Sequence, residues 1–94
     1  MSKESLEYIV LLEAIHPTTF QIILHSIILY AYSPTDAVQQ AMIEFDARQS
    51  LLEKGYQIKI ITVAPATEKS IKRVENIRQE LQLLLVKVEG DKPS

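Results

Sequence analysis

Residues 33–55, SPTDAVQQAMIEFDARQSLLEKG, decide the fold, because they predict a helix whose beginning, buried side and end are all marked. At the beginning, Ser33 can accept a hydrogen bond from a free backbone amide. Pro34 occupies a position where no amide hydrogen is needed, and Asp36 lies near the positive end of the helix dipole. These three residues predict that the helix starts at residue 34.

The end and the buried side of this helix follow from the same stretch. Lys54 in a last turn and Gly55 directly after it are typical of a helix end. Apolar residues recur at helical spacing on one side and polar residues fill the other; the apolar set is Val38, Ala41, Met42, Phe45 and Leu52. One apolar stripe needs one partner surface, which the rest of the chain should supply.

The composition indicates one small globular domain over residues 1–94, with frayed tails at 1–4 and 90–94. A domain of this size is stable by roughly 5–10 kcal/mol. The absence of cysteine, together with a polar N-terminus that lacks a signal pattern, predicts a cytoplasmic protein. Residues 1–50 carry two basic and six acidic groups and residues 51–94 carry eight and six, so neither half resembles a nucleic-acid-binding tail.

Two long strands are predicted before the helix. Residues 6–15 alternate between apolar positions and positions that include Glu7 and Glu13, which is the period of a strand. Pro17 then favours a turn, and residues 20–32 are rich in isoleucine and aromatic side chains, as in a second strand. We expect a hairpin with a two-residue loop. A helix over residues 20–32 is the alternative, because its apolar residues also fit a helical stripe.

Such a hairpin is apolar on both faces of its sheet. The helix from Ser33 can cover only one of them, and an open apolar patch on a small domain usually marks an interaction surface. The first face carries Leu6, Tyr8, Val10, Leu12, Ile23, His25, Ile27 and Leu29. The second face carries Ile9, Leu11, Ile22, Leu24 and Ile28 between Glu7, Glu13 and Ser26.

The second half of the chain predicts one more strand and one more helix. Residues 56–63 alternate as a strand, and Thr67 can cap a helix that runs through about Glu80. Its inward side is expected to hold Ile71, Val74, Ile77 and Leu81. The apolar run 83–89 fits either a fourth strand or an extension of that helix, and we favour the strand. The expected fold is α+β with the order ββαβα(β), and both helices pack on one face of a mostly antiparallel sheet.

No catalytic, cofactor or metal site is predicted. His16 is expected to lie in a solvated turn, and His25 in the middle of an apolar strand is more typical of a packing residue than of a base. Gly55 and Gly90 stand alone, so no glycine-rich phosphate loop exists. The chain is therefore interpreted as a protein that is not an enzyme and does not insert into membranes.

The leading functional hypothesis is a protein-interaction module, most simply a homodimer formed through the open apolar face or a sheet edge, acting as an adaptor, regulator or assembly subunit. The residues assigned to this interface are Ile9, Leu11, Ile22, Leu24, Ile28, Tyr30 and Tyr32. The second hypothesis is a small nucleic-acid-binding protein that contacts phosphates through the second helix. Its contact residues would be Lys69, Lys72, Arg73 and Arg78.

Overall fold

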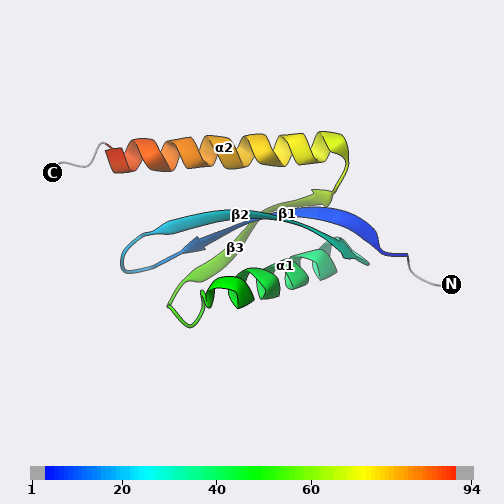
Figure 1. The fold of residues 1–94 in the computed structure, drawn as a ribbon, viewed down its shortest axis with the longest axis horizontal. Coiled ribbons are helices and arrows are strands. Elements are labelled where there is room, and N and C mark those ends of the chain that lie inside the picture. Colours follow the sequence, from blue (N-terminus) through cyan, green and yellow to red (C-terminus); the bar gives the residue numbers. More distant parts are fainter. Residues whose placement is uncertain (1–3, 91–94) are drawn as a thin grey trace.

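The computed structural model describes residues 4–90, with side chains through residue 85. Its elements are β1 (Leu6–Ile15), β2 (Ile22–Ala31), α1 (Pro34–Gln49), β3 (Gln57–Pro65) and α2 (Glu68–Gly90). The strands form one antiparallel sheet in the order β2-β1-β3 (Figure 1). The α+β class and the order ββαβα are thus confirmed. The predicted frayed tails fall mostly on residues 1–3 and 91–94, which lie outside the described residues.

The two helices lie on opposite faces of the sheet, so the prediction that both pack on one face is wrong (Figure 1). Neighbouring strands are about 4.8 Å apart. Three of them are therefore about as wide as a single helix with its side chains, about 10 Å. One helix is therefore wide enough to cover each face of the sheet. α1 packs its buried Phe45 on the face that holds Val10, and α2 packs Val74 against Ile9 and Leu11 on the other face.

The hairpin of β1 and β2 has the predicted faces but a longer loop. Ile15 lies opposite Ile22 and Leu12 lies opposite His25, whereas a two-residue loop would place Leu12 opposite Ile23. The difference is an even number of residues. Because side chains alternate with a period of two, an even shift leaves every side chain on its predicted face. The strand interpretation of residues 20–32 is confirmed within the bounds Ile22–Ala31.

The loop of this hairpin spans residues 16–21 and is organised by its first residue. Nδ1 of His16 accepts hydrogen bonds from the amides of Thr18 and Thr19, and its ring meets the ring of Tyr56 edge-on at 5.1 Å. Phe20 lies in this loop rather than in the strand, with a positive φ of 61° and its side chain 76% exposed. His16 thus lies in the turn, as predicted, but it is only partly exposed because it packs against Tyr56.

The predicted start of α1 is confirmed, and its predicted end is wrong. Ser33 accepts the amide of Asp36 at 3.1 Å, and Asp36 in turn accepts the amide of Tyr32. This bond, more than the one from Gln40, holds the pKa of the Asp36 carboxyl below its ordinary value. The helix ends at Gln49, because Ser50 takes the left-handed conformation with φ 50°.

A turn over residues 50–55 then replaces the last predicted turn of the helix. It places Leu51 in the core, whereas Leu52, predicted to be inward, is 60% exposed. Asp46 stabilises this turn by accepting the amide of Leu52 at 2.8 Å. Gly55 has the positive φ of 95° expected of it, but it serves the turn into β3 and not the helix end.

β3 contains one extra residue relative to β1, which changes how its side chains are divided between the α1 and α2 sides of the sheet. Leu11 pairs with Thr62 and Leu12 pairs with Ile60, so Ile61 has no partner of its own and forms a β-bulge. Ile60 packs on the α1 side and Ile61 on the α2 side. The bulge shifts the alternation of the strand by one residue, so that Ile58, Ile60 and Val63 all pack on the α1 side.

α2 begins as predicted and continues further. Thr67 accepts the amide of Ser70 at 3.1 Å, and Ile71, Val74 and Ile77 pack inward. The helix continues through Gly90, so the favoured fourth strand over 83–89 is wrong and the alternative, a helix extension, is correct. Leu81 and Leu85 keep the helical spacing of the inward side, which is the signal that supports the extension.

Candidate functional site

α2 crosses its face of the sheet diagonally. It starts beside the end of β3, where the amide of Ala66 binds the carbonyl of Glu7, and its middle covers Ile9 and Leu11 on β1. Further on, Glu75 meets Ser26 on β2. The C-terminal part of α2 lies near the hairpin end of β2 (Figure 1), where Leu81 and Leu85 line a cleft together with Ile22. This path leaves the other end of β2 uncovered.

The uncovered corner is apolar. Ile28 and Tyr30 project from β2 on the α2 face and are 50% and 65% exposed, and Tyr32 directly after the strand is 61% exposed. These fractions are high for large apolar side chains in a strand whose neighbour β1 is buried from Tyr8 to Leu12. We call Ile28, Tyr30 and Tyr32 the open corner.

The open corner adjoins a free strand edge. β2 pairs only with β1, so its other side has no partner within residues 4–90. At the loop, the amide of His16 binds the carbonyl of Gln21. This bond shows that the carbonyl of Gln21 points toward the β1 side of the hairpin. Because N–H and C=O groups alternate in direction along an antiparallel strand, those of the odd-numbered residues of β2 also point toward β1. The N–H and C=O groups that point to the free edge are those of Ile22, Leu24, Ser26, Ile28 and Tyr30.

The two edges of the sheet differ in their protection. Natural proteins protect edge strands with charged side chains, prolines and bulges. β3 has all three, in Lys59, Pro65 and the bulge at Ile61. β2 has ten residues, IILHSIILYA, without a lysine, arginine, carboxylate or proline, and its register with β1 is unbroken. β2 is therefore the edge on which another strand can pair.

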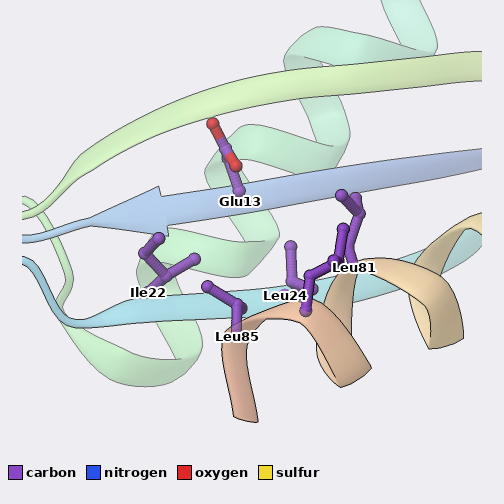
Figure 2. Close-up of a pocket in the computed structure, with 6 residues that line it drawn as sticks. Glu13, Ile22, Leu24, Leu81 and Leu85 are labelled. Atoms are coloured by element: carbon purple, nitrogen blue, oxygen red, sulfur yellow. The ribbon is translucent and has the colours of Figure 1, made fainter. Parts of the chain in front are cut away.

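A cleft of about 220 Å³ lies beside the hairpin end of β2. Ile22 and Leu24 of β2 form one side of it, and Leu81 and Leu85 of α2 form the other (Figure 2). Leu84 completes the lining and is 58% exposed. Glu13 brings the only carboxylate in the lining. The cleft thus offers an apolar depression next to the same free edge.

A polar cluster lies between the open corner and the cleft. Ser26 donates a hydrogen bond to Glu75 at 3.1 Å, and Arg78 binds the same carboxylate at 2.7 Å. The bond from Arg78 is the main reason that the pKa of the Glu75 carboxyl is held below its ordinary value, and Ser26 adds to it. The positive charge of Arg78 therefore compensates the negative charge of Glu75 at the contact between α2 and β2.

His25 lies on the α1 face, where its ring stacks on Phe45 with a centroid distance of 5.3 Å. Burial lowers the pKa of this imidazole below 6.5, and the positive charge of Arg48 lowers it further. The folded protein therefore favours neutral His25. This is the packing role predicted from the strand position.

The pKa of His25 makes a prediction about stability. Because the unfolded chain binds a proton at a higher pH than the folded chain, the free energy of unfolding should fall as the pH drops below about 6.5. We expect His25→Leu to remove this part of the pH dependence. Urea unfolding at pH 7.5, 6.5 and 5.5 measures it, with His16→Leu as the histidine control. Equal pH slopes for the protein and for His25→Leu would contradict the assignment.

The structure separates the residues predicted for the interface. Ile9 and Leu11 are buried beneath α2, with 1% and 0% of their surface exposed, so the second face is not open at these positions. Ile22 and Leu24 are partly buried in the lining of the cleft. The open corner remains on the surface. Sequence reasoning missed Leu83 and Leu84, which are 70% and 58% exposed, because it favoured a strand there.

The four predicted nucleic-acid contacts do not form one surface. Lys69, Lys72 and Arg73 are exposed on the first turns of α2. Arg78 is half-buried and held by Glu75, and at 3.6 residues per turn it lies on another side of the helix. The basic patch is thus smaller than predicted, and its contact with nucleic acid stays a prediction.

Metal-ligand clusters and membrane-spanning helices are both absent from the part of the chain that the structure describes. Among the side chains described, those of residues 4–85, no three histidines, aspartates or glutamates gather as metal ligands. No helix within residues 4–90 combines the length and the apolar character needed to cross a membrane. The described surface carries an apolar corner, an apolar cleft and a row of free backbone groups along β2. The molecule is in this sense an α+β domain with an exposed, unprotected sheet edge.

Comparison of the chain with protein-family models, with curated proteins and with solved structures found no match.

Proposed function

We propose that this chain is a non-enzymatic protein-interaction module that associates with itself through the free edge of β2. The observation that carries the proposal is the contrast between the two edges of the sheet. β3 is protected by a lysine, a bulge and a proline, whereas β2 is long, regular and uncharged.

Side-chain exposure supports the same edge. Ile28 and Tyr30 stand beside the unpaired backbone groups, and a strand added at this edge would cover them. Main-chain hydrogen bonds would supply affinity, while the apolar side chains would lose their contact with water. A second copy is the simplest partner, because a two-fold axis lets one free edge satisfy another identical one. In this role the chain would act as an adaptor, a regulator or an assembly subunit.

Nucleic-acid binding is the weaker alternative. The basic residues that remain as candidate phosphate contacts are Lys69, Lys72 and Arg73. They are interleaved with the acidic Glu68 and Glu75 on the same helix. A mixed face of this kind is more typical of a solvated helix surface than of a phosphate-binding track.

A lysine at the edge tests the proposal. Ile28→Lys should convert a dimer to a monomer, because the ammonium group would have to lose water against apolar surface of the second copy. We expect the dissociation constant to rise about 30-fold or more, the effect of a 2 kcal/mol hot spot. Light scattering behind a sizing column, over a range of protein concentrations, measures the molar mass.

Ile43→Lys is the matched control. Ile43 is 70% exposed on α1 and lines a separate groove of about 360 Å³ that also includes Leu52 and Ile58. The same substitution there should leave the dimer intact. A monomer from Ile43→Lys and a dimer from Ile28→Lys would move the interface to the α1 groove. A protein that is monomeric without any substitution would overturn self-association itself.

A further inference from the structure

The open corner and the cleft occupy opposite ends of β2 on the same face of the sheet. We infer that two copies of β2 pair antiparallel about a two-fold axis that lies midway between their two Ser26 residues, and that Tyr30 of each copy packs beside the cleft of the other. This inference rests on the proposed self-association and gives it a register, a contact and a partner surface.

Symmetry restricts the register. Two identical strands that continue one sheet are related by an axis perpendicular to it, and this rotation keeps each face on its own side. Residues directly opposite each other must share a face. Only registers in which an even-numbered residue meets another even-numbered residue, and an odd one an odd one, satisfy this condition. The axis must therefore lie at a position where one residue stands opposite the same residue of the second copy.

The free backbone groups select the residue on the axis. They belong to the even-numbered residues from Ile22 to Tyr30, and the middle one of these five is Ser26. With the axis at Ser26, every outward-pointing N–H or C=O group of one β2 lies opposite an outward-pointing group of the β2 of the second copy. An axis at Ile28 would leave the outward groups of Ile22 opposite residue 34, which is a proline that lacks an amide hydrogen. The register at Ser26 uses the whole edge.

Side chains agree with this register. Ile28 comes opposite Leu24 of the second copy, and Tyr30 comes opposite Ile22 of the second copy. Ile22 and Leu24 form the β2 side of the cleft (Figure 2). The exposed Leu84 also lines this cleft. Each open corner is therefore set against the other copy's cleft. The exposed Phe20 and Tyr32 come opposite each other just beyond the strands.

The centre of the pairing suits a close approach. Ser26 is the smallest of the five outward residues and is already bonded to Glu75. Glu75 is paired with Arg78, so the cluster next to the axis carries no net charge. Two such clusters can approach without the repulsion that two unpaired carboxylates would cause.

Single cysteines test the register, because the chain has no cysteine of its own. Residues opposite each other in a hydrogen-bonded pair have Cα atoms about 5.5 Å apart, and this separation suits a disulfide. Ser26→Cys should give a covalent dimer under mild oxidation. Leu24→Cys alone and Ile28→Cys alone should not, but an equimolar mixture of the two should cross-link. Non-reducing electrophoresis of samples taken over time measures the rates.

The outcomes separate the register from the proposed function. Cross-linking of Ile28→Cys alone, or no reaction of the mixed Leu24→Cys and Ile28→Cys proteins while light scattering still gives a dimer, would overturn the register and leave self-association standing. A monomer by light scattering would overturn both. Ile43→Cys serves as the control for random collision. If Ser26→Cys disturbs the structure by removing the hydrogen bond to Glu75, the mixture of the Leu24→Cys and Ile28→Cys proteins still tests the register.

Discussion

Phe45→Ala is expected to lower the free energy of unfolding by about 3–5 kcal/mol. Phe45 is the largest fully buried side chain, and it lies between α1 and the sheet with 0% of its surface exposed. Its removal takes away apolar contacts and also leaves a cavity that the surroundings can only partly fill. A domain of this size is stable by roughly 5–10 kcal/mol, so about half of its stability would be lost.

Urea unfolding followed by circular dichroism measures this loss, with all proteins compared at one concentration because self-association would add to the stability. Ile43→Ala is the control on the same helix. Its side chain is 70% exposed, and the change should stay within about 0.5 kcal/mol. Similar losses for the two variants would mean that α1 does not pack on the sheet through Phe45.

The second large effect concerns the backbone of β2. Ile28→Pro removes an amide hydrogen that points to the free edge, so it should abolish the dimer while the monomer stays folded. Ile27→Pro removes an amide that points to β1 and should instead unfold the hairpin. The two positions are adjacent, and only the direction of the amide distinguishes them.

Molar mass and circular dichroism together measure both outcomes. Ile28→Pro should be a folded monomer, and Ile27→Pro should lose its sheet signal. A folded dimer from Ile28→Pro would show that the association does not use the backbone edge of β2. A folded dimer from Ile27→Pro would contradict the assignment of which amides point outward.

Local patterns predicted most of the fold. Alternation over residues 6–15, the cap at Ser33 and the cap at Thr67 each have a local physical cause, and all three are present in the structure. The end of α1 depended on Asp46, which binds the turn that follows, and both Gly55 and Ser50 could have closed the helix. Sequence spacing alone does not decide between them.

The candidate site was predicted only in part, because it depends on how α2 lies. The apolar pattern of β1 and β2 predicted an open interaction face, but not that α2 would cover Ile9 and Leu11 while leaving Ile28 and Tyr30 exposed. That result depends on the width of a three-stranded sheet and on the diagonal path of the helix. Both are properties of the assembled domain.

The bulge in β3 has a further consequence for the size of an assembly. A molecule with two equally adhesive edges could add copies at both sides without limit and form a fibre. The edge that carries Lys59, Ile61 and Pro65 is protected against pairing, so in the proposed self-association only the edge of β2 would bind a neighbour. Growth would then stop after a single addition, and the product would be a finite six-stranded pair.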